Sequence, residues 1–146
     1  MPTQPFEETI SYLLAQICRA QRNAASDGLS ELGLHVGQEM LLRRLWQECG
    51  LTQTELAEQL CVESPTVTRM LQRMERAALI ERAVDSEDAR VSRVHVTDKG
   101  RALQIEVEEL WTQLENRVIA GFTAEEKVLL RRLLLQVQQN LAADGI

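Results

Sequence analysis

Aromatic residues are scarce in this sequence: two tryptophans, one tyrosine and two phenylalanines make up 3% of its 146 residues. The composition is instead rich in leucine, alanine, glutamate, glutamine and arginine, which is typical of a mainly helical protein. No apolar run approaches the roughly 18 residues of a membrane-spanning helix. The first residues, MPTQPFEETI, lack the basic start and apolar stretch of a signal peptide. We therefore expect a cytoplasmic protein with no membrane partner.

Cysteine and histidine are also rare, which argues against metal and disulfide sites. Cys18, Cys49 and Cys61 are widely spaced, and none belongs to a Cys-x-x-Cys pair. His35 and His95 lie sixty residues apart. Zinc cages and disulfide frameworks need closer pairs of such residues. No phosphate loop, nucleophile with a base, or pair of carboxylates stands out either, so we predict no enzyme, no metal and no cofactor.

The net charge of −6 is unevenly distributed along the chain. Between Ser64 and Arg101, eight basic residues outnumber six acidic ones, so the acidic excess falls on the rest of the chain. A locally positive segment on an acidic body can steer DNA toward one face and repel it elsewhere.

Apolar periodicity predicts two helices in the first third of the chain. Helical spacing favours a first helix over about residues 6–25, and the glycine-rich stretch 26–37 indicates a break. A second helix is expected over 36–49, with Gly50 at its end. Its inward positions are Met40, Leu41, Leu45 and Trp46.

Two short helices and a hairpin follow. Thr52 and Glu55 form a capping box that opens a helix ending near Leu60. The next helix is expected over about 65–77, because Ser64 or Glu63 can cap it and a proline at position 65 suits its first turn. The runs 79–84 and 91–96 are β-prone and predict a hairpin.

The last third of the chain predicts two long helices. Thr97 caps the first, which should reach about Ala120 and end at Gly121. Thr123 and Glu126 form a second capping box that opens the last helix. The whole order predicts a mainly α-helical fold with a small β-hairpin wing, namely a winged helix-turn-helix with helices at both ends.

The helix pair over 53–74 has the pattern of a helix-turn-helix. In its second helix Val67, Met70, Leu71 and Met74 recur at the spacing of a buried face. The opposite face carries side chains that, apart from a proline, donate hydrogen bonds to bases or phosphates, and none is acidic. The residues expected to bind DNA are Ser64, Pro65, Thr66, Thr68, Arg69, Gln72, Arg73 and Arg76.

The hairpin predicts a second DNA contact. An arginine near its tip is attracted by the negative potential of a narrow minor groove, and Arg90 is the candidate. Arg93, further along the hairpin, is included as a contact. Asp88 is expected to orient an arginine or the turn through a charge-assisted hydrogen bond. For Asp85 and Glu87 we expect only solvation of the loop.

Three segments resemble the MarR family of bacterial transcriptional regulators: LTQTELAEQL (51–60), ESPTVTRMLQRMERAALIER (63–82) and DARVSRVHVTDKGRAL (88–103). The family pattern is a winged helix-turn-helix, then Asp-x-Arg in the wing, then apolar-Thr-x-x-Gly before a long helix. The chain departs from it twice. Cys61 stands where many such turns have glycine, which predicts a turn that is either slightly strained or shaped differently. Glu63 replaces a small hydroxyl residue.

The resemblance implies a single domain over 1–146, with dimerisation helices in 1–34 and 104–146 and a DNA-binding lobe in 35–103. It further implies a homodimer that acts as a repressor by binding a pseudo-palindromic operator in double-stranded DNA. A helix that is apolar on several sides needs cover from a second chain or from its own core. Such a helix is indicated by Leu103, Ile105, Val107, Leu110, Trp111, Leu114, Val118 and Ile119.

The resemblance also implies control by a small aromatic or anionic effector between the dimer helices and the DNA-binding lobe. Candidate pocket residues are Cys18, His35, Met40, Arg43 and Trp111. Two alternatives stay open. One is a redox-sensing regulator using Cys18, because a peroxide-sensing branch has its reactive cysteine nearby, although that branch surrounds it with tyrosines and this chain has only Tyr12. The other is a winged helix that binds proteins. Cys49 and Cys61 are interpreted as structural.

Overall fold

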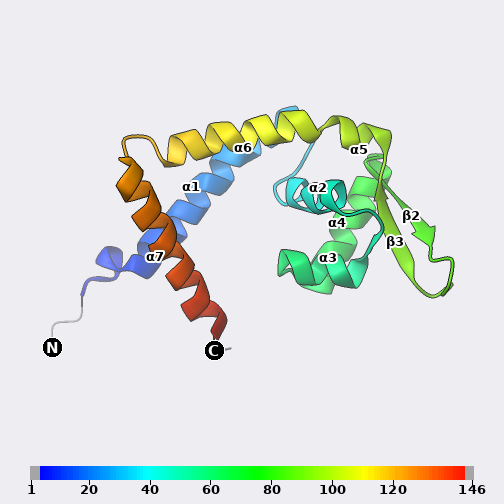
Figure 1. Cartoon of the computed structure of the whole chain (residues 1–146), viewed down its shortest axis with the longest axis horizontal. Coiled ribbons are helices and arrows are strands. Elements are labelled where there is room, and N and C mark those ends of the chain that lie inside the picture. The colour runs from blue at the N-terminus through cyan, green and yellow to red at the C-terminus, as the bar shows by residue number, and fades with distance from the viewer. Residues whose placement is uncertain (1–3, 144–146) are drawn as a thin grey trace. The chain divides into compact units, whose positions relative to one another are not determined.

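The computed structural model describes residues 4–143, which fold into helices and one small antiparallel sheet (Figure 1). They divide into two units, one ending at Trp111 and the other beginning at Thr112, within helix α6. In chain order the elements are η1 (Phe6–Glu8), α1 (Ile10–Glu31), α2 (Gln38–Gln47), β1 (Leu51–Thr52), α3 (Gln53–Leu60), α4 (Ser64–Arg76), β2 (Ile80–Val84), β3 (Ser92–Val96), α5 (Asp98–Ala102), α6 (Gln104–Val118) and α7 (Ala124–Ala143).

Helix α1 is longer than the sequence predicts. It begins at Ile10, after the cap Thr9, whose hydroxyl oxygen accepts the Tyr12 N–H at 3.2 Å. It runs on to Glu31, so the predicted break over 26–37 is wrong for its first six residues. Gly28 lies inside the helix, and a Cβ at this position would stand 2.5 Å from a methyl group of Leu110. Close packing therefore retains a glycine that by itself weakens a helix.

Helix α2 ends at Gln47, two residues earlier than predicted. Its buried apolar side chains are Leu41, Leu42 and Leu45. Trp46 is half-buried and donates its Nε1–H to the carbonyl of Gly100 at 3.2 Å. Met40 is exposed, which corrects the prediction that it faces the core, because the buried side of this helix runs through the leucines.

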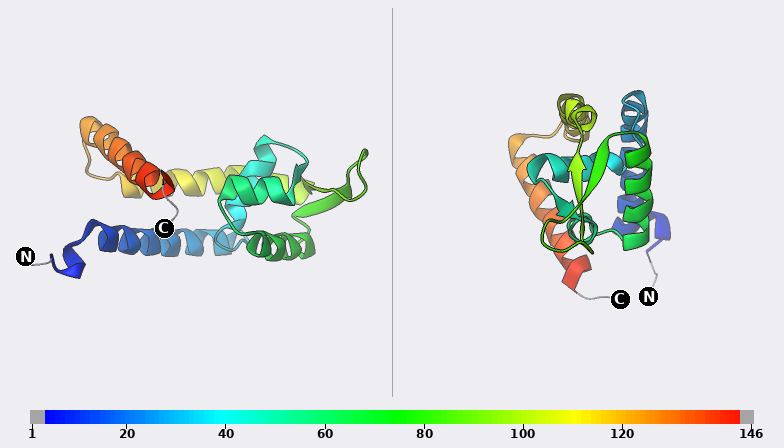
Figure 2. Two further views of the ribbon diagram at one scale, coloured as in Figure 1. Left: turned by 90° about the horizontal axis from the view of Figure 1, so that it is seen from below. Right: turned by 90° about the vertical axis from the view of Figure 1, so that its right-hand side faces the viewer.

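The sheet joins the predicted hairpin to the start of α3. Strands β2 and β3 pair with Arg82 opposite Val94, and the strand order is β1-β3-β2. Strand β1 is not predicted, because two residues carry no periodic pattern. Its pairing places Thr52, the cap of α3, opposite Arg93 of the wing. The turn between β2 and β3 projects beyond α3 and α4 (Figure 2).

The core of the first unit is aliphatic and joins its helices to the sheet. Side chains with almost no exposure include Leu29, Leu41, Leu45, Leu56, Leu71, Met74, Ile80 and Val94. They come from α1, α2, α3, α4 and both long strands, so this single core holds the helix-turn-helix against the wing.

The helix predicted over 97–120 is interrupted at Leu103. Thr97 caps α5 by accepting the Gly100 N–H at 3.1 Å, as predicted. The Leu103 N–H then bonds to the carbonyl of Gly100, three residues back, and this tighter turn separates α5 from α6.

In the second unit α7 opens with the predicted capping box, in which Thr123 and Glu126 each bind the other's N–H, at 3.2 and 2.9 Å. Its apolar side chains are largely exposed on this chain. Over residues 4–143, no helix combines the length and apolarity needed to cross a bilayer.

Candidate nucleic-acid interface

Helices α3 and α4 form a helix-turn-helix whose starts are fixed by local bonds. The Thr52 hydroxyl oxygen accepts the Glu55 N–H at 3.2 Å, and the Glu55 carboxylate accepts the Thr52 N–H at 2.8 Å. This is the predicted capping box. Helix α4 has Glu63 as its cap residue, without a side-chain bond, and Pro65 in its first turn. Of the two predicted caps, the structure has Glu63.

The turn between the two helices passes through Cys61 in the left-handed conformation, with φ 51° and ψ 43°. Residues with a Cβ rarely adopt this conformation because it brings the Cβ close to the backbone carbonyl. The N–H of Val62 closes the turn by bonding to the carbonyl of Ala57 at 3.1 Å. Cys61 thus has the left-handed conformation that a glycine adopts more readily.

The two sides of α4 differ in burial and polarity. Val67, Leu71 and Met74 are buried in the core, and Met70 is half-buried. Among the predicted DNA-binding residues of this helix, Thr68 is half-buried, and the exposed ones are Ser64, Pro65, Thr66, Arg69, Gln72, Arg73 and Arg76. The buried side fixes the orientation of the helix, so these polar and cationic side chains share one exposed surface.

Gln53, at the first position of α3, is a neighbour of this surface that the sequence pattern does not single out. Its Nε2 donates to the Thr68 hydroxyl and approaches the Ser64 hydroxyl at 3.4 Å. The Thr68 hydroxyl in turn donates to the Ser64 carbonyl at 3.0 Å. The usable signal is its place directly after the cap, since a helix-turn-helix brings the starts of its helices together.

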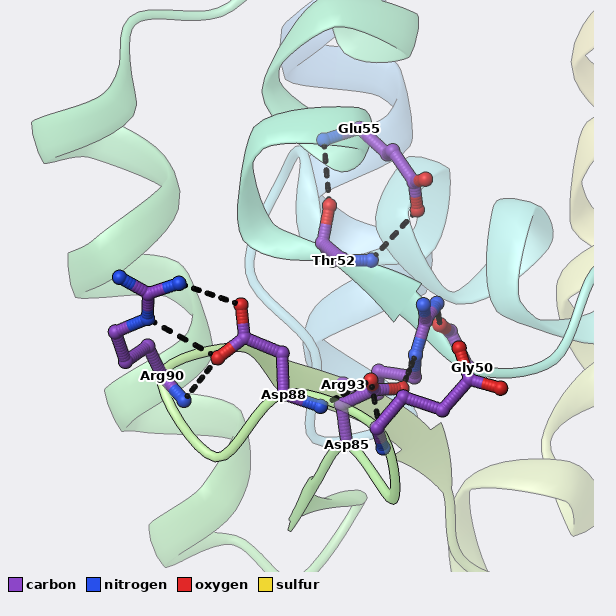
Figure 3. A network of polar contacts seen from close by, with 8 residues as sticks. Gly50, Thr52, Glu55, Asp85, Asp88, Arg90 and Arg93 are labelled. Atoms are coloured by element: carbon purple, nitrogen blue, oxygen red, sulfur yellow. Dashed lines mark hydrogen bonds and ion pairs between the residues drawn. The ribbon is translucent and has the colours of Figure 1, made fainter.

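The wing loop is organised by Asp85, which is more than a solvated loop residue (Figure 3). One carboxylate oxygen accepts the N–H groups of Glu87 and Asp88, at 3.2 and 3.0 Å. The other accepts the Nε–H of Arg93 at 2.7 Å. The expectation of mere solvation is therefore wrong for Asp85, because its partner lies eight residues away on the opposite strand.

Arg90 lies in the loop after β2, and its side chain is 90% exposed. Asp88 binds it as predicted: one oxygen accepts the Arg90 N–H at 3.0 Å and Nε–H at 3.1 Å, and the other accepts an Nη2 hydrogen at 3.2 Å. These bonds hold the pKa of the Asp88 carboxyl below its ordinary value. Asp88 thus orients a cation that remains open to solvent.

Arg93 lies at the base of the wing and is more enclosed. Besides its bond to Asp85, its Nη1 donates to the carbonyl of Gly50 at 2.9 Å. The Arg93 hydrogen bond, followed by the N–H of Asp88, lowers the pKa of Asp85, and the Asp85 carboxylate raises the pKa of Arg93. A role for Arg93 in touching DNA itself stays a prediction.

Three of the five candidate effector residues are neighbours. Met40, Arg43 and Trp111 line a cavity of about 200 Å³, together with Arg44 and Gln47. The Arg43 guanidinium lies 5.9 Å from the centre of the Trp111 ring, within range of a cation–π contact. The Trp111 Nε1 is buried, and no acceptor in residues 4–143 bonds to it. This cavity therefore offers an aromatic ring and guanidinium groups together.

The other two candidates lie elsewhere. His35 borders a separate recess with Gln38, Arg73 and Arg76, and Cys18 lies exposed on α1. Cys49 and Cys61, interpreted as structural, are also exposed free thiols. Within the described part of the chain, no three His, Cys, Asp or Glu side chains are grouped closely enough to hold a metal ion.

Comparison with known sequences places this arrangement among transcriptional regulators. Residues 34–92 match the sequence profile of the MarR family. The HTH-type transcriptional repressor Rv2887 of Mycobacterium tuberculosis is 30% identical, and the match covers 86% of this chain and 90% of that protein. YybA of Bacillus subtilis, an HTH-type transcriptional regulator, is 26% identical, with coverages of 90% and 87%.

Solved structures have the same fold. The Staphylococcus aureus MepR–DNA complex matches with a TM-score of 0.83 and 27% identity, covering 94% of this chain and 99% of that one. A crystal structure of MarR matches with a TM-score of 0.78 and 28% identity, at 92% and 98% coverage. The regulator SlyA, at 24% identity, reaches a TM-score of 0.85 over 92% of this chain and 95% of that one.

Proposed function

This chain belongs to the MarR family of transcriptional regulators, and from that we propose that it binds double-stranded DNA sequence-specifically as a homodimeric repressor. The operator would be pseudo-palindromic, because a symmetric dimer presents the same recognition helix to each half-site. We place the DNA-binding lobe in residues 35–103 and the dimerisation helices in 1–34 and 104–146.

The observation that carries this proposal is the exposed side of α4. Its buried side is fixed by the core, and the predicted DNA-binding residues on its outward side include no acidic group and, apart from Pro65, are hydrogen-bond donors. The one exposed carboxylate of this helix, Glu75, is paired with Arg82 of β2 at 3.4 Å. Arg69, Gln72 and Arg73 can reach base edges in a major groove, where arginine pairs with guanine and glutamine with adenine. Thr66 near the start of the helix is placed for phosphate. The MepR complex named above was solved with DNA.

The wing adds a contact of another kind. Arg90 is held by Asp88 yet remains exposed, at the loop that projects beyond the helix-turn-helix. An arginine presented in this way suits the minor groove beside the major groove that α4 enters. DNA would therefore be gripped by one helix and one loop from each subunit.

The homodimer accounts for apolar side chains that this chain leaves exposed. On α1 these are Ile10, Leu13 and Ile17, and on α7 they are Val128, Leu129, Leu133, Leu134 and Leu141. Exposed apolar groups in such number on a helix mark a surface that another protein covers, and each of these two helices carries such a group. A second copy of the chain would supply that cover.

We further propose that the cavity of Met40, Arg43 and Trp111 takes a small aromatic or anionic effector. Its ring can stack an aromatic molecule, and Arg43 and Arg44 can pair with a carboxylate. Binding there would change DNA affinity only if the effector favoured one of two conformations of the dimer.

The decisive experiment is selection of duplexes from a random pool by the purified protein, followed by titration of the selected duplex. Arg73→Ala and Arg90→Ala should each weaken binding about tenfold, as expected for losing an arginine contact to DNA. The logarithm of affinity should also fall steeply with the logarithm of salt concentration, because phosphate contacts release counterions.

Arg117→Ala, which removes an exposed arginine from α6, is the matched control and should bind like the wild type. Undiminished binding in both test variants would reject these contacts. Failure to enrich any duplex, with a flat salt dependence, would favour a protein-binding role for the winged helix.

A further inference from the structure

A series of hydrogen bonds runs from the base of the wing to its tip (Figure 3). The Gly50 carbonyl accepts from Arg93 at 2.9 Å, and Arg93 donates to Asp85 at 2.7 Å. Asp85 accepts the N–H of Asp88 at 3.0 Å, and Asp88 holds the guanidinium of Arg90. One end of this series of hydrogen bonds is next to the helix-turn-helix, and the other end is the exposed Arg90.

The inner end is attached firmly to the start of α3. Gly50 directly precedes β1, whose Thr52 pairs with Arg93 across the sheet and caps α3. Gly50 has φ 73°, and a Cβ there would lie 3.2 Å from the His95 ring, so this glycine is packed closely against β3. Arg93 therefore ties the wing to the helix-turn-helix through both its backbone and its side chain.

The presence of a carboxylate at Asp85 is not explained by electrostatic attraction to DNA. A carboxylate beside a proposed DNA-binding loop repels phosphates, and neutralising it would by itself favour binding. Yet the Asp85 side chain is only 16% exposed and accepts three hydrogen bonds, one from Arg93 and two from the loop backbone. All three hydrogen bonds are made within the wing, so they fix the conformation of its loop.

We propose that Asp85 and Arg93 are positioning residues that set where Arg90 stands relative to α4, and that Arg93 acts through Asp85 instead of touching DNA. The proposal rests on the DNA binding proposed above. Arg93 has two of its donor nitrogens committed within the protein and a side chain 40% exposed, against 90% for Arg90.

The direction in which Asp85→Asn changes DNA affinity distinguishes a positioning role from a simple effect of charge. Asp85→Asn removes a negative charge but also replaces one accepting oxygen by an amide donor, so either Arg93 or the loop backbone loses its partner. Positioning predicts that affinity for the selected duplex falls roughly fivefold to tenfold, as when a DNA-contacting arginine is misplaced. Charge alone predicts an increase. Glu87→Gln, in the same loop, is the matched control and should bind equally well or slightly better.

Arg93→Lys provides an independent variant. A lysine keeps the positive charge for phosphate but cannot bridge two acceptors with a planar fork. Positioning predicts a loss similar to that of Asp85→Asn, and the double variant Asp85→Asn/Arg93→Lys should be no weaker than either single one. In an Arg90→Ala background Asp85→Asn should have little further effect, whereas a general loss of folding would lower affinity and melting temperature there too.

Each outcome bears on a different claim. If Asp85→Asn binds like Glu87→Gln and Arg93→Lys binds like the wild type, while Arg90→Ala is weakened, the positioning role is rejected and DNA binding stands. If the wild type shows no salt-dependent binding to any selected duplex, the proposed function itself fails.

Discussion

Glu39 is an acidic side chain with only 2% exposure, at the start of α2. One of its carboxylate oxygens accepts the N–H of Gly37 at 2.8 Å. Burial raises the pKa of Glu39 above its ordinary value of 4.5, and the N–H bonds of its own residue and of Gly37, with Arg43 and Arg22, offset this only in part. The folded protein therefore holds the protonated form better than the unfolded chain does.

This shift predicts a pH dependence of stability with a definite sign. A carboxyl group whose pKa is raised on folding stabilises the folded state below its ordinary pKa, and that contribution is lost as pH rises through the folded value. Glu39→Gln keeps an acceptor for Gly37 without a buried charge. We expect this variant to have a larger free energy of unfolding than the wild type at pH 8. Its free energy of unfolding should also depend less on pH between pH 5 and 8.

Urea unfolding at the two pH values measures both effects. Glu58→Gln, which neutralises an exposed carboxylate of α3, is the control and should follow the wild type. A smaller free energy of unfolding for Glu39→Gln at pH 8 would mean that the charged hydrogen bond to Gly37 outweighs the cost of burial.

Individual residues also show where sequence reasoning stops. The pairing of Asp88 with Arg90 is predictable because the two residues are only two positions apart in one loop. The pairing of Asp85 with Arg93 requires knowing which side chains face each other across a hairpin, and the contact of Gln53 with Thr68 requires the angle between two helices. Both belong to tertiary structure, for which one-dimensional periodicity contains no signal.

At the scale of elements, capping residues are the most reliable guides. Both capping boxes and the Thr97 cap are where the sequence predicts them, since each is complete within four residues. Glycines are less reliable guides, because a glycine can either break a helix or lie inside one against a closely packed neighbour. Gly28 is read as part of a break but lies inside α1 against Leu110.

Helix α5 offers a direct test of such packing. A Cβ at Gly100 would lie 2.3 Å from the Leu79 carbonyl oxygen and 2.7 Å from a Val96 methyl group. Gly100→Ala must push α5 away from the hairpin and disturb the bond from Trp46, so we expect a loss of about 2 kcal/mol in the free energy of unfolding. Chemical denaturation measures it. The exposed neighbour Arg101→Ala should change stability by less than about 0.5 kcal/mol, and an equal effect of both would refute the packing argument.

For the molecule as a whole, the proposed dimer requires apolar side chains on α1 and α7 to be covered by the second subunit. Ile17 on α1 and Leu133 on α7 are apolar and exposed on the isolated chain. A charge buried at a dimer interface without a partner is strongly unfavourable. Ile17→Glu and Leu133→Glu should therefore shift the protein toward monomers in sedimentation experiments.

The same variants should weaken binding to the selected duplex roughly a hundredfold or more, because a monomer loses the second half-site. Gln139→Glu adds a charge at an exposed polar position of α7 and should leave both properties unchanged. Monomeric wild-type protein, or variants that still sediment as dimers, would contradict the proposed interface.

The small network at the start of α4 has a chemical consequence for the DNA binding that we propose. The Thr68 hydroxyl donates its hydrogen bond to the Ser64 carbonyl, and its oxygen accepts one from the Gln53 side-chain amide. What is left to offer a base is a single lone pair. Exocyclic amino groups of adenine or cytosine can bind it, whereas the oxygens of thymine and guanine would be repelled. The polarity of this side chain toward a base pair is thus decided within the protein, before any duplex is bound.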